Sequence, residues 1–135
     1  MKTVITFGTF DLVHPGHRYF LQQAKSYGDK LITIIARDQN VLKFKGHLPD
    51  RNEQQRLEDI QKLNIADIVE FGHESDYFFA IQKYRPDIIA LGHDQTQLIY
   101  DLGNFLFEHN YKTEVVTIDA YQSDIYKSSL IKQKT

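Results

Sequence analysis

Short, mostly apolar segments alternate in this chain with segments of helical periodicity, and no other feature of the sequence restricts the fold as much. The apolar segments predict five strands, at 4–7, 31–36, 65–71, 88–91 and 114–118. Apolar residues that recur on one face predict four helices, at 18–25, 52–63, 77–84 and 98–109. Strands that are apolar on both faces belong to parallel sheets covered on both sides. The pattern therefore predicts a doubly wound α/β domain, with helices on both faces of a five-stranded parallel sheet.

Length and composition restrict the class of protein further. A chain of 135 residues suits a single domain spanning 1–135 with one continuous core. It has no cysteine, which excludes disulfides and thiolate zinc sites. The formal net charge of −2 disfavours a nucleic-acid partner, and no apolar run is long enough to span a membrane. Residues 1–7 lack the features of a signal peptide, so a cytoplasmic protein is expected.

In a Rossmann-like sheet of this kind, ligands bind beyond the carboxyl ends of the strands, where the strand order reverses. The chemistry is therefore expected in the loops after the first, second and fourth strands. The first of these loops reads GTFDLVHPGH and opens a helix. Gly8 would permit close backbone approach, and Pro15 is preset for a first helical turn. Free amides at a helix start favour phosphate, and His14 and His17 could donate hydrogen bonds to the same phosphate oxygens.

Residues 8–17 resemble the GTFDxxHxGH form of the HxGH signature of the cytidylyltransferase-like nucleotidylyltransferases. The resemblance implies an enzyme that transfers a nucleoside monophosphate from a nucleoside triphosphate to a phosphorylated small-molecule acceptor and releases pyrophosphate. It implies that His14 and His17 hold the triphosphate and stabilise charge on the α-phosphate. The same loop supplies further candidates, namely Gly8, Thr9 and Phe10 for the nucleotide and Asp11 for the acceptor.

The segment after the second strand carries basic candidates. Lys43 and Lys45 lie on a predicted turn and could reach phosphates as mobile charges. In the resembling family this loop carries phosphate-contacting lysines, so Lys43 is expected in catalysis and Lys45 in acceptor binding; the alternative is a solvated basic turn. Arg56 falls where relatives have an arginine in an E-x-x-R-L-like stretch and is expected at the acceptor. The alternative for Arg56 is a surface ion pair with Glu53 or Glu58.

The loop after the fourth strand reads LGHDQ and is similar to the LGxD stretch that lies against the nucleoside in the family. Gly92 and Asp94 are therefore expected to bind the nucleotide. Asp94 could also help to hold a metal ion, although its alternative is simple helix capping. No other protein ligand for a metal is predicted, and Mg²⁺ is expected to arrive with the nucleotide.

The C-terminal segment 126–132 resembles the family's second signature, an ISTS-like sequence that opens the last helix. Lys127, expected in catalysis, and Ser128 and Ser129, expected at the nucleotide, would meet the β- and γ-phosphates. The arginine of the family pattern is missing here, and Lys127 would replace its charge. An ordinary helix cap is the alternative interpretation.

These assignments predict direct in-line attack of an acceptor phosphate on the α-phosphorus, with Mg²⁺ bridging triphosphate oxygens. The groups expected to offset the growing negative charge are His14, His17, Lys43, Lys127 and Ser128. Relatives of this length are often homodimers, so a homodimer is expected. The aromatic segment 77–79 is predicted to belong to the core rather than to an interface.

The resemblance points to two subgroups with different substrates. Glycerol-3-phosphate cytidylyltransferases share GTFD and HxGH and use CTP. Archaeal-type FAD synthases, which transfer AMP from ATP to FMN, are also similar at 36–38, 45–46, 86–92, 94–95 and 127–129. The second subgroup is favoured, while the nucleotide and the acceptor stay open. A nucleotide sensor without turnover and a histidine-based metal hydrolase are the alternatives from other classes.

Overall fold

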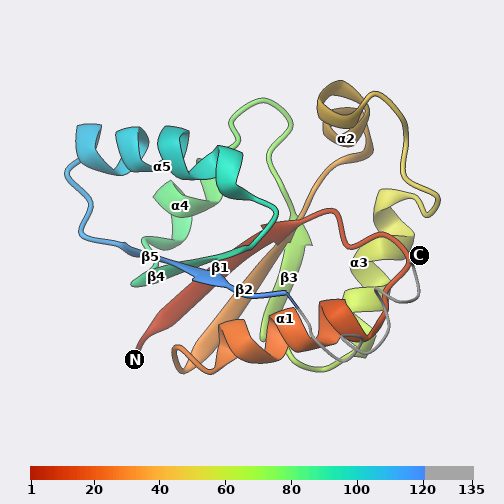
Figure 1. The fold of residues 1–135 in the computed structure, drawn as a ribbon, viewed down its shortest axis with the longest axis horizontal. Coiled ribbons are helices and arrows are strands. Elements are labelled where there is room, and N and C mark those ends of the chain that lie inside the picture. Colours follow the sequence, from red (N-terminus) through yellow and green to blue (C-terminus); the bar gives the residue numbers. More distant parts are fainter. Residues whose placement is uncertain (121–135) are drawn as a thin grey trace.

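The computed structural model describes residues 1–120, which form one five-stranded sheet covered by helices (Figure 1). The strands are β1 (Thr3–Gly8), β2 (Lys30–Ile35), β3 (Ile68–Phe71), β4 (Ile88–Gly92) and β5 (Glu114–Ile118). The helices are α1 (Pro15–Lys25), α2 (Asp38–Lys45), α3 (Glu53–Lys62), α4 (Phe79–Tyr84) and α5 (Thr96–Glu108). The strand order is β3-β2-β1-β4-β5, and every neighbouring pair is parallel. The predicted Rossmann-like α/β fold is confirmed.

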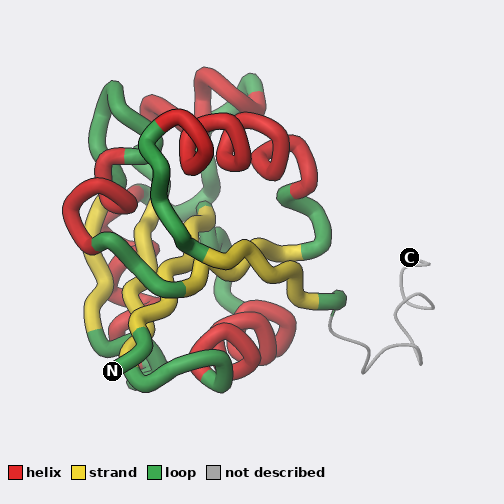
Figure 2. Tube along the Cα trace, turned by 90° about the vertical axis from the view of Figure 1, so that its left-hand side faces the viewer, coloured by secondary structure: helices red, strands yellow, loops and turns green. Residues whose placement is uncertain are grey.

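Two hydrophobic clusters lie on opposite faces of the sheet, because successive strand residues point to opposite sides. Val4 belongs to the cluster that packs against α1 and α3, and Ile5 belongs to the cluster that packs against α4 and α5. Figure 2 shows the helices on both sides of the strands. This double cover is the reason that the strands contain so few polar residues. No helix within residues 1–120 has both the length and the apolar character that crossing a membrane would require.

The prediction of a basic turn after the second strand was wrong, because residues 38–45 form the helix α2. Asp38 lies in its first turn, where a carboxylate suits the helix dipole, and Gly46 ends it with φ at 83°. Only Val41 is buried on this helix. One apolar contact does not produce a periodic signal, which explains why the sequence pattern did not reveal α2.

Two other boundaries differ for local reasons. α1 begins at Pro15 rather than at Arg18, because His14 caps the helix before its apolar face starts. β3 begins at Ile68 rather than at Ile65, because the carboxylate of Asp67 turns the chain by accepting hydrogen bonds from the backbone amide of Leu31 and from a lysine of α1.

The aromatic segment 77–79 belongs to the core only in part. Phe78 packs against the α4 and α5 cluster, whereas Tyr77 and Phe79 are 38% and 43% exposed. The helix α4 starts at Phe79, so Tyr77 lies in the preceding loop. The core prediction is therefore correct for Phe78, while Tyr77 lies half-buried against Phe7 of β1 and Phe79 is partly exposed.

Candidate active site

The central strands β1 and β4 separate at their carboxyl ends. Their ladder joins Val4 to Ile88 and Ile5 to Ile89, and it does not extend to Phe7 or beyond within the described strands. Pairing of β1 with β2, on the other side, continues to the last residue of both strands. The opening lies where the strand order reverses, which is where doubly wound sheets bind their ligands.

Gln95 spans this opening. Its side-chain amide donates to the carbonyl oxygen of Phe7 at 2.9 Å, and its side-chain oxygen accepts from the amide of Gly92 at 2.7 Å. One carboxamide thus replaces the backbone hydrogen bonds that β1 and β4 no longer make to each other. Gln95 thus joins the ends of β1 and β4, and it was not predicted as a site residue.

The loop between β1 and α1 brings the two predicted imidazoles together at the start of α1. His14 is the N-cap, and its Nδ1 accepts from the amide of Gly16 at 3.0 Å. Nδ1 of His17 accepts from the amide of His14 at 3.2 Å. The two rings are stacked, with their centroids 3.9 Å apart and an interplanar angle of 28°. The pair forms a reciprocal capping box, a role in which Ser or Thr and Glu or Gln are more usual.

This cap determines which nitrogen of each ring carries the proton. Because Nδ1 of both rings accepts a backbone hydrogen bond, the proton of each neutral imidazole lies on Nε2. Partial burial lowers the pKa of His14. Burial, followed by the charge of His14, lowers the pKa of His17 to about 4, against the opposing effect of nearby carboxylates. Both rings are therefore neutral near pH 7 and present Nε2–H donors at a helix N-terminus, which suits phosphate oxygens.

We expect acid to destabilise the protein through His17. This imidazole titrates at about 4 in the fold and near its ordinary value of 6.5 when unfolded, so the unfolded chain binds more protons between these two pH values. The contribution is therefore fully present above pH 6.5 and is lost as the pH falls through about 4. Thermal unfolding midpoints measured from pH 7.5 to pH 4.5 should show this decline, and they should show it less steeply in His17→Gln, which cannot titrate. Parallel curves for the two proteins would contradict the assignment.

A buried arginine connects this loop to α2 and α3. The side chain of Arg56 is 0% exposed and donates to the carbonyl of Thr9 at 2.8 Å, to Oδ1 of Asp38 at 2.7 Å and to the carbonyl of Arg51 at 2.9 Å. The prediction that Arg56 contacts the acceptor is wrong, because protein atoms enclose this guanidinium. The alternative of a surface ion pair with a glutamate of its own helix is also wrong. Arg56 instead holds in place the backbone of the loop between β1 and α1.

Asp11 makes a second connection between the same segments. Its carboxylate accepts from the amides of Asp50 at 2.8 Å and Arg51 at 3.0 Å, just before α3 begins. Burial acts to raise the pKa of Asp11, but the two amide hydrogen bonds and the charge of Arg56 outweigh it, so the pKa lies below its ordinary value. The structure thus shows a tether at a position that was predicted to bind the acceptor.

The glycines at the strand ends make room for neighbouring protein side chains. A Cβ on Gly8 would lie 2.6 Å from the ring of Phe10, which is 6% exposed and packs in the core. The close approach predicted at Gly8 is therefore made by this ring, and Phe10 can offer a nucleotide only its backbone. The ring of Phe10 also meets His17 edge-on, at a centroid distance of 5.6 Å. A Cβ on Gly92 would lie 3.0 Å from Oδ1 of Asp94.

The remaining candidates lie around the crevice without joining the imidazole pair. Lys43 and Lys45 are exposed in the last turn of α2, and Asp94 is exposed after β4. Within residues 1–120, no group of three or more histidine, aspartate or glutamate side chains is placed to hold a metal ion. Three predicted residues lie outside the described part of the chain: Lys127, Ser128 and Ser129.

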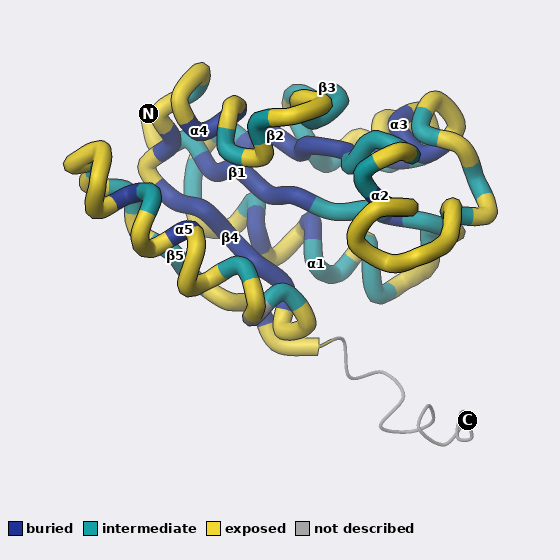
Figure 3. The backbone as a smooth tube through the Cα atoms, turned by 90° about the horizontal axis from the view of Figure 1, so that it is seen from above, coloured by how far each residue is buried: buried dark blue, intermediate teal, exposed yellow. Residues whose placement is uncertain are grey.

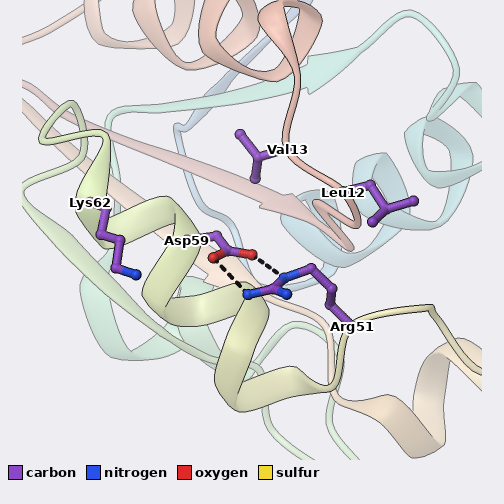
Figure 4. A pocket seen from close by; sticks show the side chains of 5 residues that line it. All are labelled: Leu12, Val13, Arg51, Asp59 and Lys62. Carbon is purple, nitrogen blue, oxygen red and sulfur yellow. Dashed lines mark hydrogen bonds and ion pairs between the residues drawn. The ribbon is translucent and has the colours of Figure 1, made fainter.

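Two surface hollows lie beside the loop between β1 and α1. The larger, of about 410 Å³, separates this loop from α3 (Figure 4), and its cationic wall is occupied by an ion pair between Arg51 and Asp59. The smaller, of about 290 Å³, is lined in part by His14 and Arg18. The larger hollow has no imidazole in its wall and its arginine is already paired, so the start of α1, where His14 lines the smaller hollow, is the better candidate for phosphate chemistry.

Comparison with known proteins agrees with this geometry. Residues 5–134 match the family model described as Cytidylyltransferase-like. The chain belongs to this family. A member from Methanococcoides burtonii named FAD synthase is 44% identical over 119 residues, which cover 88% of this chain and 82% of the relative. The FAD synthase of Thermococcus sibiricus is 42% identical over 133 residues, covering 97% of this chain and 90% of the relative. As a member of this family, the protein is a nucleotidyltransferase.

Solved structures share the fold of this chain. The lipopolysaccharide core biosynthesis protein from Thermoplasma volcanium superposes with a TM-score of 0.83 at 33% identity, over 90% of this chain and 98% of that one. The pantothenate synthetase of Thermus thermophilus superposes with a TM-score of 0.65 at 13% identity, over 99% of this chain and 64% of that one. The second likeness concerns the fold alone.

Proposed function

We propose that the protein is an FAD synthase, which transfers AMP from ATP to the phosphate of FMN and releases pyrophosphate. A phosphate oxygen of FMN attacks the α-phosphorus, a new P–O bond forms, and the bond between the α-phosphorus and the bridging oxygen of pyrophosphate breaks. The observation that carries the proposal is the stacked pair His14 and His17, whose Nε2–H donors lie at a helix start beside the β1–β4 crevice. Relatives named FAD synthase at 42% to 44% identity support the choice of substrates.

Neutral imidazoles suit this reaction because it requires positioning and charge stabilisation rather than a covalent intermediate. His14 and His17 would donate to oxygens of the α-phosphate as negative charge grows there. The backbone of Thr9 and the β4 end, including Gly92 and Asp94, would contact the nucleotide. Lys127 would take part in catalysis beyond the described residues, and Ser128 and Ser129 would contact the β- and γ-phosphates.

A divalent cation such as Mg²⁺ would neutralise triphosphate charge and orient the pyrophosphate leaving group. Asp94, exposed just after β4, offers a carboxylate of the kind that Mg²⁺ prefers as a ligand. We propose this role for Asp94 alone.

We further propose that the chain works as one domain, 1–135, in the cytoplasm as a homodimer, on ATP and FMN and without a nucleic-acid or membrane partner. The modest net charge of −2 supports the absence of a polyanionic partner. Light scattering of the purified protein would test the homodimer, and a monomeric mass would refute it.

Pyrophosphate release from ATP and from CTP, each with FMN or glycerol 3-phosphate, tests the function. We expect turnover with ATP and FMN and formation of FAD. Turnover with CTP and glycerol 3-phosphate instead would assign the protein to the cytidylyltransferase activity. Nucleotide binding without pyrophosphate release in any combination would show a sensor.

Replacing Gln95 by glutamate should raise the KM for ATP roughly tenfold with a smaller effect on kcat. The substitution keeps the shape of the side chain but removes the donor to the Phe7 carbonyl and places a negative charge beside it. The crevice would widen or tilt, and the nucleotide would bind less well. Gln97→Glu, an equal change of charge at an exposed position of α5, is the matched control. An unchanged KM in Gln95→Glu would remove this residue from the nucleotide site.

A further inference from the structure

Two aromatic rings from separate segments lie exposed together above the carboxyl ends of the strands. Phe44 of α2 is 70% exposed, and Tyr77 of the loop between β3 and α4 is 38% exposed. Their ring centroids are 6.4 Å apart, with an interplanar angle of 74°. We call Phe44 and Tyr77 the aromatic shelf. Figure 3 shows that α2, the helix that carries Phe44, is exposed along most of its length.

The aromatic shelf is joined to the wall of the crevice. Tyr77 stacks on Phe7 of β1 with a centroid distance of 5.6 Å and an angle of 24°. The carbonyl of this same Phe7 accepts the hydrogen bond from Gln95 that bridges β1 and β4. In Figure 1, α2 and the loop that carries Tyr77 lie on the same side of the sheet, beyond the arrowheads of the strands. A molecule lying on the shelf would therefore reach into the crevice.

Positive charge accompanies the exposed rings. Lys43 and Lys45 flank Phe44 in the last turn of α2, and Nζ of Lys43 lies 6.0 Å from the centre of the Phe44 ring. A planar aromatic molecule with a phosphate would match both features, because rings stack on aromatic side chains and ammonium groups attract phosphate. A phosphorylated polyol such as glycerol 3-phosphate would match the lysines but leave the rings without a partner.

We propose that the aromatic shelf binds the flavin ring of the acceptor, with Phe44 stacked on the flavin and the nearly perpendicular Tyr77 ring meeting its edge, while Lys43 and Lys45 contact the acceptor phosphate. This inference rests on the proposed FAD synthase activity and adds to it the residues that select a flavin. Phe44 supplies most of the free ring surface, and Tyr77 is held in place by its stacking on Phe7.

Quenching of flavin fluorescence tests the aromatic shelf directly, with FMN and riboflavin as the two probes. Phe44→Ala should weaken the binding of both probes about tenfold, since the ring is common to them. Lys43→Ala combined with Lys45→Ala should weaken the binding of FMN and leave that of riboflavin unchanged. Phe107→Ala is the matched control, because this phenylalanine is 87% exposed near the far end of α5. In steady-state kinetics, Phe44→Ala should raise the KM for FMN about tenfold without changing the KM for ATP.

Different results would refute the aromatic shelf and the proposed FAD synthase activity. Equal flavin affinity in wild type and Phe44→Ala would overturn the shelf, even if the wild type forms FAD. An equal loss in Phe107→Ala would overturn it as well. A wild type that binds flavin through Phe44 but forms no FAD would refute the proposed synthase and keep the shelf. Tyr77→Phe, which preserves the ring, should bind like wild type, and a loss as large as that in Phe44→Ala would refute the contact proposed for the Tyr77 ring.

Discussion

Replacing His17 by alanine should lower kcat by about a hundredfold or more, as measured by pyrophosphate release from ATP and FMN. The Nε2–H of this ring is the better defined of the two donors, because burial keeps the imidazole neutral and its Nδ1 is held by the amide of His14. In the variant, the negative charge that develops on the α-phosphate in the transition state would lack this hydrogen-bond donor. His109→Ala, at an exposed histidine of the α5 C-terminus, should leave kcat unchanged.

A second variant separates catalysis from helix capping. His17 is the third residue of α1, where glutamine is a usual member of a capping box. His17→Gln can keep the hydrogen bond from the amide of His14 but has no imidazole Nε2–H. We therefore expect it to restore the stability lost in His17→Ala, by about 1 kcal/mol, without restoring kcat. Recovery of turnover in His17→Gln, or a loss below tenfold in His17→Ala, would show that the ring is structural.

Replacing Arg56 by methionine should reduce the free energy of unfolding by about 3 kcal/mol. The change leaves two backbone carbonyls, those of Thr9 and Arg51, and the carboxylate of Asp38 without the guanidinium that they share. The loss should fall at the lower end of the range for buried charge pairs, because the Asp38 side chain is 30% exposed and water can reach it. Urea unfolding at pH 7.5 would measure the loss, and the exposed Arg18→Ala should change stability by less than about 0.5 kcal/mol.

The partner carboxylate provides an internal check on this prediction. Adding Asp38→Asn to Arg56→Met removes the uncompensated charge, so the double variant should be less destabilised than the sum of the single changes. Arg56→Lys should be intermediate, because an ammonium keeps the charge but cannot reach three acceptors in different directions. A free energy of unfolding in Arg56→Met that equals that of Arg18→Ala would refute the role of Arg56 as the anchor of the loop between β1 and α1.

The elements with strong local signals were predicted closely. β5 has the expected bounds, Glu114–Ile118, and α3 differs by one residue at each end. Asn52 caps α3 and Gln55 completes its capping box, so the signal for this helix start was present in the sequence. α2 was missed because it buries one apolar residue and is held from outside by the mutual capping of Asp38 and Glu53. That capping joins segments which no local pattern connects.

The residues of the candidate site also differ in how far the sequence could predict their place. His14 and His17 could be predicted because both lie within one short motif, three positions apart at a helix start. The pattern could not show that Arg56 is enclosed, because its contact with Thr9 spans 47 residues of sequence. Nor could it show that Gln95 closes the crevice, because the carbonyl that it binds is 88 residues away. Residues 94–95 are similar to the same stretch of the FAD synthases, but this similarity could not show which backbone groups Gln95 contacts.

Sequence alone determined the class of fold and the helix start at which His14 and His17 meet, because periodicity, capping and motif spacing act over a few residues. Only the tertiary structure decided which polar groups face a ligand and which hold the scaffold, since burial depends on the elements that pack around each side chain. Arg56 moved from the acceptor to the scaffold for this reason. Phe44 and Tyr77, distant in the chain, became neighbours at the site because α2 and the loop before α4 meet above the ends of the strands.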